Sequence, residues 1–176
     1  MIERYSPVAV VLHWLVAIGI AVNLWIGLRF DDTPKDQMKA AVGLHKSVGI
    51  TILLLVLMRI LWRVSHKPPA PLATLQPWER VLSVATHHVL YLLILVEPLL
   101  GWLEESAGKN AATTPIVLYN AIPWFHLPAP RSLHGLFEGA HSLLGWVLMA
   151  AIALHILGAL KHQFYDREKE VQRMWF

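Results

Sequence analysis

The stretch AHSLLGWVLMAAIALH, residues Ala140–His155, decides the fold because it is an apolar run with histidine near its start and at its end. It lies within residues 139–160, a segment long enough to cross a bilayer, which takes roughly 20 apolar residues per helix. The sequence therefore predicts an all-α chain that forms a single transmembrane domain over residues 1–176. Its integral membrane four-helix bundle has predicted helices at residues 7–28, 41–62, 81–103 and 139–160.

The overall composition favours a membrane protein over a soluble one. Apolar residues make up 56% of the chain and charged residues only 15%. The first apolar segment is too long for the core of a signal peptide, so we expect it to be retained as a helix. The chain has no cysteine, which excludes disulfides, thiolate nucleophiles and iron–sulfur clusters. Any redox chemistry would need a bound cofactor.

The basic residues predict the orientation in the membrane. The formal charge is +3, but its carriers are spread over helix ends and loops, so we expect no nucleic-acid partner. Residues 1–6, 64–80 and 161–176, with Arg59 and Arg63, hold most of the fifteen Lys and Arg. Because such residues stay inside, both termini are predicted to be cytoplasmic. The connection over residues 104–138 is then outside, with PIVLYNAIPWFHLPAP on the membrane surface.

The two histidines of the opening stretch cannot share one metal. Fourteen residues of helix rise about 21 Å and turn within roughly 40 degrees of four full turns. His141 and His155 therefore lie on one helix face at opposite membrane depths. Two separate sites become possible if each histidine finds a second ligand at its own depth.

Topology supplies those second ligands. His13 lies about two turns from the inner end of its helix, at the depth of His155, and His45 lies in the first turns of the second helix, at the depth of His141. Opposed neutral imidazoles without cysteine or a carboxylate set fit two haem irons better than zinc. His87 also has a depth that suits the inner site, so either it or His13 completes that pair. A haem ring needs space between helices, and five glycines could provide it or could serve only close helix packing: Gly19, Gly49, Gly101, Gly145 and Gly158.

Cationic side chains near the membrane edges are candidates to hold haem propionates. Arg59 and Arg63 are candidates at the inner edge, and Lys46 and Arg131 at the outer edge. The alternative for each is simple snorkelling to the interface.

Two further ionisable groups stand near membrane depth. His162 lies two turns beyond His155, where it could hydrogen-bond a quinone and pass it a proton, with Lys67 and Arg63 beside it. The alternative is a solvated helix end. Glu97 is expected near the outer interface, facing water. Residues Tyr165–Phe176 are predicted to form a short amphipathic segment, and water is expected to satisfy His66, His126 and His134.

The same residues carry a resemblance to the bacterial cytochrome b561 family, which includes superoxide oxidases. It runs through YSPVAVVLHW, GLHKSVGI, RILWR with HKPPAP, THHVLYLL with PLLGW, and the paired histidines ending in GALKHQF. The resemblance implies a four-helix cytochrome of the bacterial inner membrane with two haem b groups. It also implies that His13, His45, His141 and His155 are the axial ligands.

The resemblance further implies electron transfer between a periplasmic donor, such as superoxide, and ubiquinone near the cytoplasmic side. An alternative is a cytochrome b subunit that links a periplasmic dehydrogenase or hydrogenase to the quinone pool. A surface that attracts superoxide should be electropositive. The acidic residues near the outer face offset its Arg and Lys in number, so the sequence does not decide whether superoxide is the donor. A third hypothesis is a haem-free transporter or proton channel whose histidines relay protons.

Overall fold

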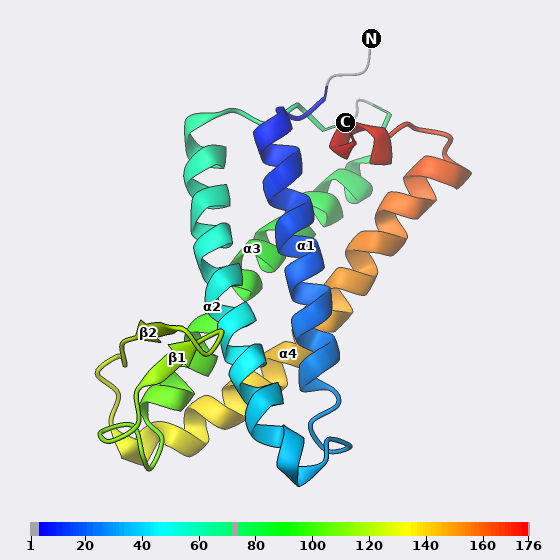
Figure 1. Ribbon diagram of the computed structural model, residues 1–176. Helices are drawn as coiled ribbons and strands as arrows, with labels where there is room; N and C mark the ends of the chain where they lie inside the picture. Colours follow the sequence, from blue (N-terminus) through cyan, green and yellow to red (C-terminus); the bar gives the residue numbers. More distant parts are fainter. Residues whose placement is uncertain (1–3, 72–73, 176) are drawn as a thin grey trace.

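A computed structural model describes residues 4–71 and 74–175 and has four long helices. They are α1 (Pro7–Gly27), α2 (Lys35–Ser65), α3 (Pro77–Ser106) and α4 (His134–Leu160). All four are long and apolar enough to cross a membrane. The four predicted apolar helices are therefore confirmed, and they form the bundle in Figure 1.

The helix ends differ from the predicted ranges because polar turns extend the apolar segments. The helix α2 begins at Lys35 and α4 at His134, several residues before the predicted starts at 41 and 139. The helix α3 begins at Pro77, where Gln76 and Glu79 form a capping box. Helical propensity continues through such turns after hydrophobicity has ended.

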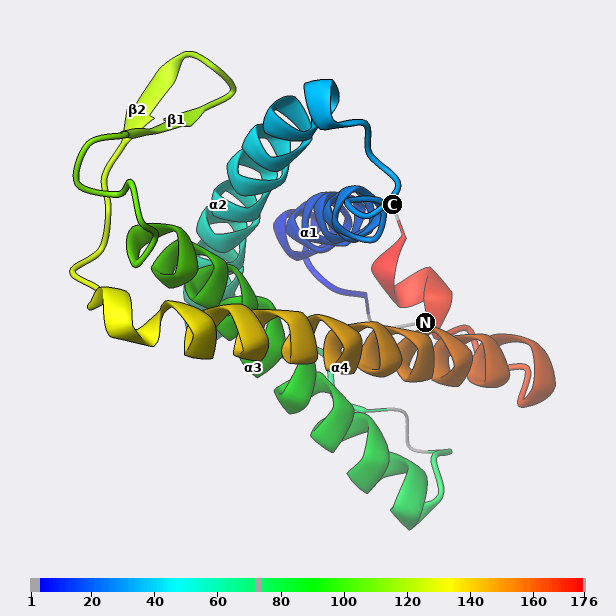
Figure 2. The same cartoon turned by 90° about the horizontal axis from the view of Figure 1, so that it is seen from below.

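The helices pack mainly in two pairs, α1 with α2 and α3 with α4. Figure 2 shows α1 nearly end-on, α2 obliquely and α4 running across the view. A buried core joins all four helices, and Leu148 of α4 packs in it midway between His141 and His155. Many apolar side chains outside this core are exposed, as expected for helices that face lipid.

Both ends of the described chain lie at one end of the bundle, which we call the termini end (Figure 1). The backbone N–H of Tyr5 donates to the carbonyl of Arg173 there. The predicted C-terminal amphipathic segment follows a π-helical turn (Lys161–Tyr165) and contains a short 3-10 helix (Val171–Met174). The indole of Trp14 donates to the carbonyl of Met174, which fixes this segment against α1. Phe176 lies outside the described residues.

A short β-hairpin lies at the opposite end, which we call the hairpin end. Strands β1 (Ile116–Leu118) and β2 (Ile122–Trp124) pair antiparallel. Tyr119 and Asn120, both with positive φ, form the turn between them, as a tight hairpin requires. The N–H of Tyr119 donates to the buried hydroxyl of Ser47, which joins the hairpin to α2. The segment PIVLYNAIPWFHLPAP, predicted to lie on the membrane surface, thus contains two short strands that were not predicted.

Candidate functional site

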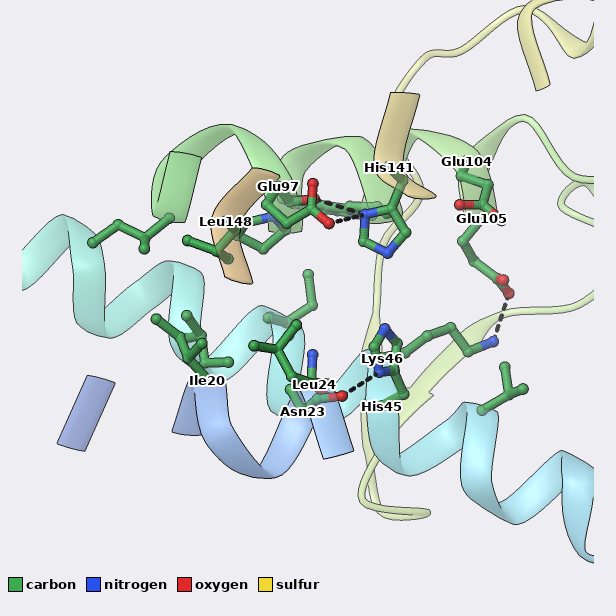
Figure 3. Close-up of a pocket in the computed structure, with 18 of the residues that line it drawn as sticks. Ile20, Asn23, Leu24, His45, Lys46, Glu97, Glu104, Glu105, His141 and Leu148 are labelled. Atoms are coloured by element: carbon green, nitrogen blue, oxygen red, sulfur yellow. Dashed lines mark hydrogen bonds and ion pairs between the residues drawn. The ribbon is translucent and has the colours of Figure 1, made fainter. Parts of the chain in front are cut away.

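Two histidines face each other across a cavity at the hairpin end. His45 of α2 and His141 of α4 have ring centroids 6.1 Å apart, with the rings at 74° to each other. Figure 3 shows both rings directed into the same space. Two imidazoles bound to opposite sides of one iron, through bonds of about 2 Å, have centroids about 6 Å apart. This hairpin-end pair therefore has the separation of two axial haem ligands.

The Nδ1 atom of each ring lies within hydrogen-bond distance of a backbone carbonyl oxygen. His45 Nδ1 lies 3.2 Å from the carbonyl oxygen of Asn23, and His141 Nδ1 lies 3.1 Å from that of Glu97. In the tautomer with hydrogen on Nδ1, each ring donates to its carbonyl. Histidines that ligate metals are commonly oriented this way. The Nε2 lone pairs are then left for a metal.

The surroundings of the pair are small and apolar. The cavity has a volume of about 350 Å³, and Ile20, Leu24, Ile94 and Leu148 are among its lining residues. Added Cβ atoms at two glycines would press on the rings. At Gly101 the Cβ would lie 3.0 Å from Cε1 of His141, and at Gly27 it would lie 3.3 Å from Cε1 of His45. Glycine therefore leaves room where each ring approaches a neighbouring helix.

Glu97 corrects one expectation from the sequence. Its side chain is only 13% exposed, and its Oε1 lies 3.2 Å from Nδ1 of His141. The carboxylate therefore faces the histidine rather than water. Sequence reasoning missed this contact because it depends on the crossing of α3 and α4, which brings Glu97 beside His141 although they are far apart in the chain.

Three histidines gather at the termini end. His13 and His155 have ring centroids 6.3 Å apart at an angle of 73°, while His87 and His155 are 5.2 Å apart. The first distance matches two opposed ligands of one iron, and the second is shorter than that arrangement requires. His87 Nδ1 also lies 2.7 Å from the carbonyl of Ser83, one turn earlier in α3. We call His13 and His155 the termini-end pair.

The predicted propionate partners have different surroundings. Arg59 donates to the hydroxyl of Tyr91, and Arg63 lies over the ring of the same tyrosine. Lys46 lines the hairpin-end cavity and pairs with Glu105 at 2.8 Å. Arg131 is exposed at the start of a 3-10 turn (Arg131–Leu133). It is absent from the described residues that line the cavity.

The predicted quinone residues His162, Lys67 and Arg63 make no contact with one another among the described residues. His162 Nδ1 lies 2.7 Å from Oδ2 of Asp166, while Lys67 is exposed beyond α2. Lys161 bridges Asp166 to Glu79, the capping residue of α3. The hydrogen bond from Lys161 lowers the pKa of Asp166, and the one from His162 acts in the same direction. The ammonium of Lys161 is therefore shared between the two carboxylates.

Comparison with known proteins agrees with this architecture. The family described as prokaryotic cytochrome b561 matches residues 4–176. Cytochrome b561 homolog 2 of Escherichia coli (strain K12) is 35% identical, over 98% of this chain and 91% of that protein. Probable superoxide oxidase CybB of Yersinia pestis is 26% identical, over 99% and 97%. Cytochrome b562 of Cereibacter sphaeroides is also 26% identical, over 97% and 94%.

The family match spans nearly the whole chain, and it agrees with the four membrane-length helices and with histidine pairs at the spacing of haem ligands. The chain therefore belongs to the prokaryotic cytochrome b561 family and is a membrane electron-transfer cytochrome.

Proposed function

We propose that this chain binds two haem b groups and transfers electrons between a donor at the hairpin end and ubiquinone near the termini end. His45 and His141 hold one haem, and His13 and His155 hold the other. The observation that carries this proposal is the pair of ring separations, 6.1 Å and 6.3 Å. Bound haem supplies reversible one-electron chemistry that no side chain of this cysteine-free chain offers.

The protein's own residues set the distance between the two sites and keep water out. The helix α4 contributes one histidine to each pair, and fourteen residues of helix place them about 21 Å apart along its axis. The core around Leu148 fills the space between them. With both termini cytoplasmic, the hairpin end faces the periplasm and the termini end faces the cytoplasm.

Cationic side chains near the membrane edges are the proposed partners of the propionates. Arg59 and Arg63 hold propionates at the termini end, and Lys46, which lines the cavity, does so at the hairpin end. Arg131 is exposed and does not line the described cavity, so we assign no propionate to it. His162 faces a quinone carbonyl with its Nε2, because Asp166 occupies Nδ1 and orients the ring. Lys67 and Arg63 lie on the same side of the membrane and complete the quinone site.

Superoxide is the first candidate for the donor, which would make the chain a superoxide:ubiquinone oxidoreductase. A relative named as a probable superoxide oxidase supports it. A second candidate is a protein donor, such as a periplasmic dehydrogenase or hydrogenase that this cytochrome links to the quinone pool. One observation favours the second candidate: Glu97, Glu104 and Glu105 line the hairpin-end cavity against one lysine, Lys46. Such a lining repels a small anion.

The purified protein is expected to contain two haems per chain and to give b-type bands in a reduced-minus-oxidised spectrum. The reason is that both histidine pairs have the separation of axial ligands. A haemochrome assay against protein concentration measures the stoichiometry. A chain that carries no haem when purified from haem-sufficient cells would contradict the proposal and favour a proton channel or transporter.

The donor is identified by mixing the oxidised protein with superoxide in the presence and absence of ubiquinone. Sustained quinone reduction by the isolated chain is expected if superoxide is the donor. Reduction of haem without turnover, together with a periplasmic dehydrogenase that co-purifies and restores quinone reduction, would establish the electron-transfer subunit instead. Superoxide dismutase added to the first assay is the control, since it removes the substrate.

A further inference from the structure

We infer that Glu97 and Arg59 create a difference in reduction potential between the two sites, which drives electrons from the hairpin end to the termini end. This inference rests on the proposed function, because it assumes one haem at each histidine pair. Glu97 places a negative charge beside His141, one histidine of the hairpin-end pair. Arg59 places a positive charge beside the termini-end pair. Together they assign a direction to electron flow.

The carboxylate of Glu97 is directed at His141. Its Oε1 lies 3.2 Å from Nδ1 of the ring, and its own backbone carbonyl lies 3.1 Å from the same nitrogen (Figure 3). Its Oε2 is buried and has no hydrogen-bond partner among the described residues. A charge on this buried carboxylate acts strongly on the adjacent ring, because little water lies between them to screen it.

Two glycines, one on each helix, leave the space that this contact between Glu97 and His141 needs. Gly101 of α3 leaves room for the ring of His141 from α4. Gly145 of α4 leaves room for Glu97 from α3, since a Cβ there would lie 3.2 Å from Oε1. Each helix therefore lacks a side chain where the other inserts one. His45, the second histidine of the pair, has a neutral partner in the carbonyl of Asn23.

The remaining charges at the hairpin end do not cancel Glu97. Lys46 is the cation of the cavity lining, and it is paired with Glu105 at 2.8 Å. Glu104 lines the same cavity. The described lining therefore carries more negative than positive charge.

The termini-end pair has the opposite setting. The guanidinium of Arg59 donates to Tyr91 at 3.0 Å and reaches the carbonyl of Ala9, one turn before His13 in α1. The guanidinium therefore lies within about one helical turn of the termini-end pair. The carboxylates at this end, Glu79 and Asp166, are both bonded to Lys161.

The two charges act on the potential in opposite directions. A carboxylate on a ligand's second nitrogen makes the imidazole more basic and stabilises the more positive, oxidised state, which lowers the potential. A nearby cation stabilises the reduced state, which raises it. One electron then leaves the hairpin-end site, which is oxidised, and enters the termini-end site, which is reduced. Two such transfers supply one quinone, which also takes up two protons.

The test is a spectroscopic redox titration of the complete protein, fitted with two one-electron midpoints. Glu97→Gln is expected to raise the lower midpoint potential by about 59 mV, which is about a tenfold change in the equilibrium constant for reduction. Arg59→Met is expected to lower the higher midpoint by a similar factor. Arg59→Lys, which keeps the charge, should retain most of the wild-type value. Glu138→Gln, an exposed acid on α4, should change neither midpoint.

Glu97→Gln keeps the size of the side chain, so haem content serves as its check on folding, and Arg59→Lys is the control for Arg59→Met. If the wild type holds two haems and Glu97→Gln shifts neither midpoint, or shifts the higher one, the inference is wrong while the proposed function stands. An unchanged higher midpoint in Arg59→Met overturns it equally. A wild-type protein without two haems refutes the proposed function itself, which separates the two failures.

Discussion

Replacing His155 by alanine is expected to reduce the haem content from two per chain to one, whereas replacing His87 by alanine should leave both haems bound. His155 is the only histidine of α4 at the termini end that belongs to a proposed pair, and the ring of His13 lies at the distance of a second ligand, 6.3 Å. His87 lies 5.2 Å from His155, closer than two opposed ligands of one iron require. Haemochrome stoichiometry of the two purified variants measures the difference.

The spectrum of the remaining haem adds a second readout to this contrast. In His155→Ala, the bands of the hairpin-end haem should persist with their wild-type position and bis-histidine character, because His45 and His141 are far from the change. His13→Ala should resemble His155→Ala, since both remove one ligand of the same iron. If only the His87 change emptied the termini-end site, then His87 and not His13 would be the ligand.

The histidine pairs could be predicted from the sequence because helix geometry is regular over long distances. Four apolar segments and alternating topology assign each histidine a depth, and depth is compatible with pairing His45 with His141 and either His13 or His87 with His155. The structure brings His13 and His155 to a ring distance of 6.3 Å, and His45 and His141 to one of 6.1 Å. Depth does not distinguish His13 from His87, because that choice depends on how each helix is rotated about its axis.

The contacts of Glu97 could not be predicted for the same reason. Its position near membrane depth is visible in the sequence, but its direction follows from the rotation of α3 and from the absence of side chains at Gly101 and Gly145. The hairpin was missed for a different reason. Its strands are only three residues each, too short for an alternating pattern to be recognised, and its turn residues Tyr119 and Asn120 are not the usual glycine pair.

Replacing Gly101 by valine is expected to remove the hairpin-end haem without touching a ligand. A Cβ at this position would lie 3.0 Å from Cε1 and 3.3 Å from Nε2 of His141, closer than carbon atoms normally approach. The ring cannot easily retreat, because its Nδ1 is bonded to the carbonyl of Glu97. Valine adds two further methyl groups at this contact. We therefore expect a chain with one haem, which retains the spectrum of the termini-end site.

The matched control is Gly139→Val, which places the same side chain on an exposed part of α4 where a Cβ meets nothing within 4 Å. It has a similar effect on helix propensity, so both haems should remain. Gly101→Ala, which adds only the Cβ, should give partial occupancy or a weaker hairpin-end signal. A Gly101→Val protein with two haems and an unchanged spectrum would show that His141 does not rest against α3 here. Because α3 supplies both this glycine and Glu97, that result would also remove the structural basis for a carboxylate acting on His141, and the assigned direction of electron flow would fail with it.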